Sequence, residues 1–173
     1  MAHRRQSRET LDLRGAWTFQ VDPFNAGERA GYFAAEMDDS GWRRVTLPAG
    51  FDGCGPGLTT YQGYGWFRRA FTVPAAWRGR AVRVHCGAVN YRATVWLNGC
   101  CLGEHSDPFL PFAFAVEALL RYGEENVLTV RVDAAPRAGE VPGVEHGWRP
   151  IGRILREVTL RAMPPLRLEN LRW

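Results

Sequence analysis

Apolar and polar residues alternate with a period of two through the middle of the chain. The apolar positions form four runs: Val82, Val84 and Cys86; Tyr91, Ala93, Val95 and Leu97; Phe112, Phe114 and Val116; and Leu128, Val130 and Val132. This period places one set of side chains on one face of a sheet. Asn98-Gly99 follows the second run and accepts the positive φ angles of a type I′ turn, so a hairpin through Cys101-Leu102 is predicted. The centre of the chain is therefore predicted to be antiparallel sheet.

Shorter apolar runs on either side predict further strands separated by turns. Strands are predicted over residues 11–21, 43–47, 61–74 and 154–160, single helical turns over 32–37 and 117–122, and long loops over 49–60 and 134–150. Gly123 is predicted to end the second helical turn, because glycine adopts the left-handed conformation readily. About eight strands with almost no helix predict an all-β fold, a two-sheet sandwich of the jelly-roll type.

The composition is that of a folded chain with one domain. Its 173 residues are 46% hydrophobic and 12% aromatic, which is enough to bury a core. No apolar run approaches the roughly 20 residues that span a bilayer. Arg4, Arg5 and Arg8 lead directly into Glu9 without the apolar stretch of a signal peptide. We therefore expect a cytoplasmic protein that does not insert into a membrane.

All 22 basic residues are arginine, and the net charge is +4. A surface for nucleic acid or acidic sugars is one interpretation, and a bias of the coding sequence towards arginine is the other. The arginines occur in ones and twos with no run of five, which favours the second interpretation. No nucleic-acid partner is expected.

The four cysteines form no CxxC pair and have no histidine at a metal-binding spacing. We therefore expect no metal, no cofactor and reduced thiols. Cys100 and Cys101 are neighbours on a predicted strand, where successive side chains point to opposite faces, so one thiol should be buried and the other exposed.

Several segments together resemble the N-terminal sugar-binding domain of family 2 glycoside hydrolases, the beta-galactosidase, beta-glucuronidase and beta-mannosidase group. The resemblance rests on LRGAWTF at residues 13–19, W..V.LP at 42–48, YQGYGWFRRAFTVP at 61–74, GAVNYRATVWLNGCCLGEH at 87–105 with the following PF.F.V, GEENVLTVRVD at 123–133 and GRILREVTL at 152–160. These segments follow the family's order over nearly the whole chain. The resemblance implies a galactose-binding-domain-like jelly roll.

The resemblance also implies a division of the chain. Residues 1–10 are an N-terminal tail, residues 11–162 are the sugar-binding jelly-roll domain, and residues 163–173 are a linker and the start of an immunoglobulin-like domain. In whole enzymes of the family that domain is followed by a TIM barrel with both catalytic glutamates. The chain is then an accessory domain whose partners are a β-linked carbohydrate and these missing domains.

The carboxylates of the sequence do not predict a catalytic pair. Retaining glycoside hydrolysis needs two carboxyl groups roughly 5 Å apart on either side of the scissile bond. The neighbouring pairs Asp38-Asp39 and Glu124-Glu125 lie in predicted turns, where such side chains bond the nearby backbone. No catalytic residue is predicted.

Five residues are candidates for contact with the sugar. Asn90 and Tyr91 combine an amide and an aromatic ring, which suit the hydroxyls and the apolar face of a pyranose. The family's acidic residue before the last strand aligns with His146, a departure that weakens the inference of a family-type sugar or sodium contact. Trp148 and Arg149 match the family. Either they bind a sugar, or Trp148 packs at the sheet edge and Arg149 pairs with a carboxylate.

Two other functions are compatible with the sequence. An autonomous carbohydrate-binding module needs a complete sugar site with an exposed aromatic platform. A structural domain that docks onto a barrel or forms a homo-oligomer needs an exposed apolar patch.

Overall fold

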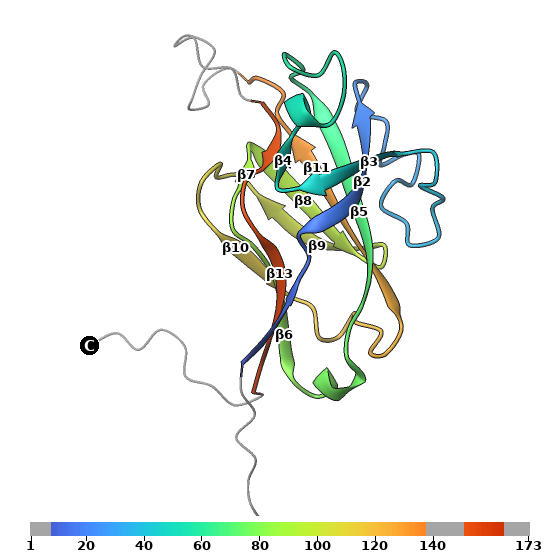
Figure 1. Cartoon of the computed structure of the whole chain (residues 1–173), viewed down its shortest axis with the longest axis vertical. Helices are drawn as coiled ribbons and strands as arrows, with labels where there is room; N and C mark the ends of the chain where they lie inside the picture. Colours follow the sequence, from blue (N-terminus) through green and yellow to red (C-terminus); the bar gives the residue numbers. More distant parts are fainter. Residues whose placement is uncertain (1–7, 138–150, 165–173) are drawn as a thin grey trace, which may run out of the picture.

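A computed structural model describes residues 8–137 and 151–164 (Figure 1). The strands are β1 Glu9–Asp12, β2 Gly15–Asp22, β3 Arg43–Leu47, β4 Ala49–Gly50, β5 Tyr64–Thr72, β6 Ala81–Cys86, β7 Val89–Asn90, β8 Arg92–Leu97, β9 Cys100–His105, β10 Phe112–Ala115, β11 Glu125–Asp133, β12 Arg153–Ile154 and β13 Val158–Met163. Two short 3₁₀ turns, η1 Phe51–Gly53 and η2 Ala75–Trp77, complete the described elements. β1 begins inside the segment that the sequence assigned to a tail.

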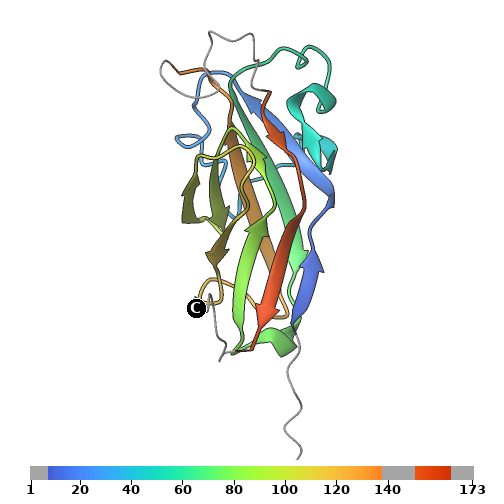
Figure 2. The same ribbon diagram turned by 90° about the vertical axis from the view of Figure 1, so that its left-hand side faces the viewer.

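The strands form two large antiparallel sheets and one small one. The first has the order β1-β13-β6-β10 and the second the order β3-β2-β5-β11-β8-β9. Figures 1 and 2 show these two sheets packed face to face, with the three-stranded sheet β4-β12-β7 at one end. The predicted all-β sandwich of the jelly-roll type is confirmed.

The period-two positions fill the space between the two large sheets. Val84 on β6, Val95 on β8 and Val130 on β11 are fully buried and belong to one continuous apolar cluster. Burying a valine or leucine side chain contributes about 1.5–3 kcal/mol relative to exposure. The apolar residues that alternate along the sequence are therefore the side chains that pack in the core.

The predicted hairpin at Asn98-Gly99 is present. Asn98 has a φ of 51° and Gly99 a φ of 83°, the positive angles of a type I′ turn. The Asn98 amide also donates from Nδ2 to Leu119 O at 2.9 Å and accepts at Oδ1 from Val127 N at 2.9 Å. Asn98 thus connects the hairpin to β11, through Val127, and to the segment before β11, through Leu119.

Two predicted strands are each divided. Residues 154–160 form the end of β12 and the start of β13, which belong to different sheets, because the chain bends at Arg156. Residues 11–21 fall into β1 and β2, separated by two residues before Gly15, whose φ is 101°. In both places the alternation of apolar residues continues across a change of sheet.

The predicted helical turns and the first predicted loop also differ from the structure. Residues 32–37 and 117–122 form irregular turns, and only Gly123, with a φ of 82°, has its predicted conformation. The segment 49–60 contains β4 and η1, and Phe51 within it is fully buried. Added Cβ atoms at Gly65 and Gly152 would lie 2.4 and 2.2 Å from its ring, so both glycines make room for Phe51.

The expectation for Cys100 and Cys101 is wrong, because both thiols are exposed. The pairing of β9 with β8 shifts between Val95 and Trp96, which interrupts the regular alternation of faces, and β9 is an outer strand of its sheet. Cys54 and Cys86 are buried, and burial raises the pKa of each thiol to about 12.

We expect two of the four thiols to react in the native protein. Iodoacetamide at pH 8 should alkylate Cys100 and Cys101, while Cys54 and Cys86 stay unmodified because they are buried and protonated. Mass spectrometry of tryptic peptides measures this directly, with a urea-unfolded sample as the control in which all four react. Rapid native alkylation of Cys54 or Cys86 would contradict the packing described.

Candidate functional site

The end of the sandwich closed by β4, β12 and β7 holds the first predicted sugar residue. Asn90 ends β7, pairs with Arg153 of β12, and is only 6% exposed. Its Nδ2 donates to Ile151 O at 2.8 Å, which fixes the amide. Within residues 8–137 and 151–164 no group donates to its Oδ1. That oxygen is available as an acceptor for a ligand hydroxyl.

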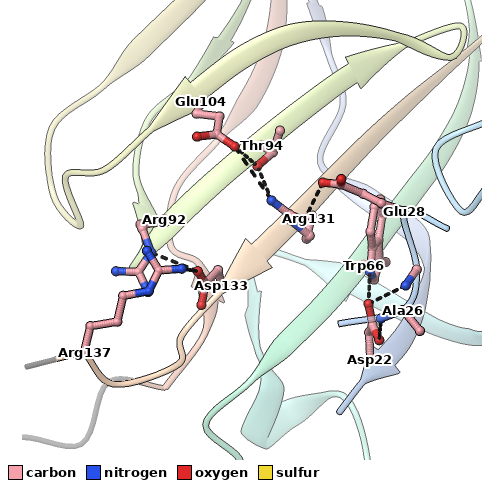
Figure 3. Close-up of polar contacts among 11 residues, drawn as sticks. Asp22, Ala26, Glu28, Trp66, Arg92, Thr94, Glu104, Arg131, Asp133 and Arg137 are labelled. Carbon is pink, nitrogen blue, oxygen red and sulfur yellow. Dashed lines mark hydrogen bonds and ion pairs between the residues drawn. The ribbon is translucent and has the colours of Figure 1, made fainter. Parts of the chain in front are cut away.

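Tyr91 follows directly and is held by a charged network. The Arg92 guanidinium lies 5.3 Å from the centre of the Tyr91 ring. Arg92 Nε donates to Asp133 Oδ2 at 2.9 Å, and Arg137 Nη2 donates to the same oxygen at 2.9 Å (Figure 3). Asp133 Oδ1 accepts from Ala135 N at 2.9 Å. The network connects Tyr91 to the chain that leaves β11.

Two of the five candidate sugar residues lie in the part of the chain that the structure describes. Asn90 and Tyr91 lie together at this end of the sandwich, with the tyrosine half-buried. His146, Trp148 and Arg149 lie outside the described residues. The Asp133 network was not among the sequence candidates, because its members are separated by up to 45 positions and no local pattern links them.

The outer face of the six-stranded sheet carries a second aromatic cluster. It consists of Trp42, Trp66 and Trp96, with Tyr32, Phe33 and Met37 packed against them. The Trp66 and Trp96 rings stack at 5.1 Å between centroids, and Phe33 stacks on Trp96 at 5.8 Å. These rings are covered by the connection between β2 and β3.

A buried arginine fastens that connection to the sheet. Arg68 on β5 is 2% exposed. Its Nη1 donates to Tyr32 O at 2.7 Å and to Ala34 O at 2.9 Å, and its Nη2 donates to Met37 O at 3.3 Å. Its Nε forms an ion pair with Asp39 Oδ2 at 3.2 Å. One guanidinium therefore satisfies four acceptors of a segment that has no helix or strand of its own.

A second arginine lies against the same rings. Arg131 on β11 places its Cζ 5.8 Å from the ring centres of Trp66 and Trp96. It pairs with Glu28 and donates from Nη2 to Thr94 Oγ1 at 3.0 Å (Figure 3). The positive charge thus lies over aromatic faces, which attract cations, and also has a carboxylate partner.

The start of the connection is held by Asp22, at the end of β2. Its Oδ1 accepts from Ala26 N at 2.7 Å, and its Oδ2 accepts from Gly27 N at 2.8 Å and from Trp66 Nε1 at 3.0 Å (Figure 3). An added Cβ at Gly27 would lie 2.5 Å from Trp66 Nε1, so the close approach requires glycine. The connection is fixed to the indole at this end as well.

These contacts leave no tryptophan platform on the described surface. The five tryptophans of residues 8–137 and 151–164 are all buried; they are Trp17, Trp42, Trp66, Trp77 and Trp96. An aromatic sheet face that binds sugar needs exposed rings. The broad face of the six-stranded sheet is therefore a packed layer.

The neighbouring carboxylates have structural roles. The Ser40 backbone N–H donates to Asp38 at 2.9 Å and lowers the pKa of that carboxyl, the opposite of what a general acid needs. Asp39 is the partner of Arg68. In the part of the chain that the structure describes, no group of three or more His, Cys, Asp or Glu side chains is placed to hold a metal ion. Nor does any helix there have the length and apolar character to cross a membrane.

Comparisons with known proteins give a consistent result. The family model for glycosyl hydrolases family 2, sugar binding domain, matches residues 10–164. A beta-glucuronidase of Paenibacillus borealis is 30% identical over 129 residues, covering 73% of this chain and 21% of the relative. A beta-glucuronidase of Canis lupus familiaris is 33% identical over 127 residues, covering 68% of this chain and 19% of the relative.

A solved structure agrees with these relatives. The Lactobacillus rhamnosus beta-glucuronidase matches with a TM-score of 0.80 at 27% identity, covering 92% of this chain and 29% of that one. The chain spans about a fifth of the length of the two beta-glucuronidases compared above.

Replacing Arg68 should open the covered aromatic layer. In Arg68→Ala the carbonyls of residues 32, 34 and 37 and the Asp39 carboxylate lose their donor, and we expect the free energy of unfolding to fall by about 3 kcal/mol or more. Tryptophan emission should shift to the red as Trp42, Trp66 and Trp96 become hydrated. Urea unfolding followed by fluorescence measures both.

Arg44→Ala is the matched control, because Arg44 is exposed on β3, the edge strand of the same sheet, and its loss should change neither quantity. An Arg68→Ala protein with wild-type stability and emission would contradict the role assigned to this guanidinium.

Removing the charge of Asp133 should loosen the site network. In Asp133→Asn, Arg92, whose side chain is 12% exposed, loses its ion pair with the Asp133 carboxylate, and we expect destabilisation of about 1–3 kcal/mol. Urea unfolding is the measurement. Asp12→Asn, which breaks an exposed ion pair with Arg14, should have little effect. Equal effects of the two substitutions would contradict the assignment.

Proposed function

The chain belongs to glycosyl hydrolase family 2, in which it matches the sugar binding domain, and from this membership we propose that it is the accessory carbohydrate-binding domain of a β-glycosidase. Its part in that enzyme is to contribute the Asn90–Tyr91 end of the sandwich to the sugar site. Bond cleavage belongs to domains that carry a pair of catalytic carboxylates.

The geometry of Asn90 is the observation that carries the proposal. Its amide nitrogen is fixed on Ile151 O at 2.8 Å, and its oxygen points to no donor of the described residues. An acceptor that is already oriented binds a hydroxyl without further loss of side-chain entropy. The half-buried Tyr91 ring beside it offers an apolar surface with a polar tip, which suits one face of a pyranose.

The sugar is proposed to be a β-glycoside, with a β-glucuronide as the first to be tried. The two curated relatives described above are named beta-glucuronidases, and so is the solved structure. His146, Trp148 and Arg149 remain predicted members of the same sugar site.

An autonomous binding module is a weaker alternative, because the five described tryptophans are buried. A docking surface has its own support. Phe24 is 86% exposed, and Phe109 and Leu110 are 53% and 59% exposed. Asp107 Oδ1 accepts from both Phe109 N and Leu110 N, at 2.9 and 2.8 Å, so the apolar pair is presented on an ordered turn. Contact with the remaining domains of the enzyme is consistent with an accessory role.

Residue-resolved titration tests the proposal. A ¹⁵N-labelled chain titrated with methyl β-D-glucuronide, galactoside and mannoside should show weak saturable shifts at the Asn90 side-chain amide and the Tyr91 N–H. Nitrophenyl β-glycosides should not be cleaved. Asn90→Ala should abolish the shifts at Tyr91, since the ligand acceptor is gone.

Asn25→Gly is the matched control, because it removes an exposed amide at a residue whose φ of 50° glycine tolerates. Shifts confined to the outer face of β5, absence of shifts at Asn90 and Tyr91 with every sugar, or turnover by the chain alone would contradict the proposal.

A further inference from the structure

A cleft lies beside the edge of the six-stranded sheet. Its lining comes from three segments: Gln20 and Val21 of β2, Gly41 and Arg43 at the start of β3, and Pro56 and Leu58 of the connection between η1 and β5. The volume is about 480 Å³, within the range of roughly 300–1,000 Å³ that small-molecule sites occupy. It shares no lining residue with the Asn90–Tyr91 end.

Arg43 supplies the charge of this cleft. It is paired in register with Phe19, which faces the core, so its side chain leaves the outer strand β3 on the core-facing side, where it is still exposed to solvent. Within the described ranges Arg43 has no hydrogen bond or ion pair to another residue. Its five N–H donors are available, and a guanidinium binds a carboxylate through two parallel hydrogen bonds.

Gly55, the residue before the lining residue Pro56, leaves room for this guanidinium. An added Cβ at Gly55 would lie 2.1 Å from Arg43 Nη1 and 2.5 Å from its Cζ, so the arginine head rests directly on the glycine backbone. Any side chain at this position would displace it. Gly53, two residues earlier, has no atom within 4 Å of an added Cβ. The close approach is therefore specific to Gly55.

The remaining walls add an amide and an apolar surface. Gln20 donates from Nε2 to Val21 O at 3.2 Å, which leaves its Oε1 as an acceptor. Val21 and Leu58 are partly exposed and Pro56 is exposed, and all three are apolar. A cation and an apolar wall in one cleft, with a glutamine among the lining residues, match a sugar acid, which carries a carboxylate, hydroxyl donors and a C–H face.

We propose that this cleft is a second carbohydrate site, which binds a hexuronate through a bidentate contact between its carboxylate and Arg43. The proposal goes beyond the accessory function described above, since it concerns a different part of the sandwich and does not depend on sugar contact at Asn90. A charge on the inner side of an edge strand also discourages pairing with other chains, but that role alone gives no selective binding of a ligand.

Heteronuclear NMR titration of the 173-residue chain is the test, with glucuronate, its neutral methyl ester, glucose and acetate as ligands. Glucuronate should shift the N–H signals of Gly41, Gly55 and Leu58 saturably. The methyl ester and glucose should bind at least about tenfold more weakly, because a hydrogen bond to a charged group contributes about 1.5–3 kcal/mol. Acetate, which lacks the hydroxyls and the apolar face, should be weaker than glucuronate by a similar factor.

Matched variants separate the cleft from general charge effects. Arg43→Gln should weaken glucuronate at least about tenfold, whereas Arg44→Gln, the same change at the adjacent arginine, which is also exposed but does not line the cleft, should not. Gly55→Ala should have the effect of Arg43→Gln because it displaces the guanidinium, and Gly53→Ala should leave binding unchanged.

Equal losses in Arg43→Gln and Arg44→Gln, or unchanged binding in Gly55→Ala, would overturn the site. Equal affinity for acetate and glucuronate would overturn the sugar as its ligand. Shifts at Asn90 without shifts at Gly41 and Gly55 would overturn this inference and leave the proposed function intact.

Discussion

The contacts of one buried guanidinium decide which surface of this protein is open. Arg68 holds the carbonyls of Tyr32, Ala34 and Met37 and the carboxylate of Asp39. These acceptors belong to the connection between β2 and β3, which forms no ladder hydrogen bonds with a neighbouring strand. Hydrogen bonds from Arg68 therefore hold this connection in place. Because buried polar groups are costly when unpaired, arginine and connection stabilise each other.

Under the proposed function, recognition takes place at the ends of the strands, because the broad face of the six-stranded sheet is covered. Trp66 and Trp96, which would otherwise form an aromatic platform on the outer face of the six-stranded sheet, are 0% and 5% exposed. Asn90 and Tyr91 sit where β7 and β8 meet, and the cleft at Arg43 sits where β2 and β3 meet the connection to β5. Loops and strand ends on a rigid sandwich are the usual places for ligand contacts. The sandwich thus supplies rigidity, and its ends supply the polar groups.

The sequence predicted the parts of the fold that depend on local periodicity. Val84, Val95 and Val130 alternate with polar neighbours because each strand has one face in the core, and Asn98-Gly99 identifies the hairpin because few residue pairs accept its angles. Phe51 was missed because its burial depends on space left by Gly65 and Gly152, which are distant in sequence. Asn90 and Tyr91 came from a family resemblance, whereas the partners of Arg68 and Asp133 appear only once separate strands are side by side.

A crystal structure of the chain with a saturating methyl β-glycoside tests the central claim, that sugar is bound at the strand ends while the aromatic face stays covered. We expect the sugar to lie against Asn90 Oδ1 and Tyr91, with residues 32–39 held by Arg68 as in the free protein. A sugar stacked on Trp66 or Trp96, with residues 32–39 displaced, would contradict it.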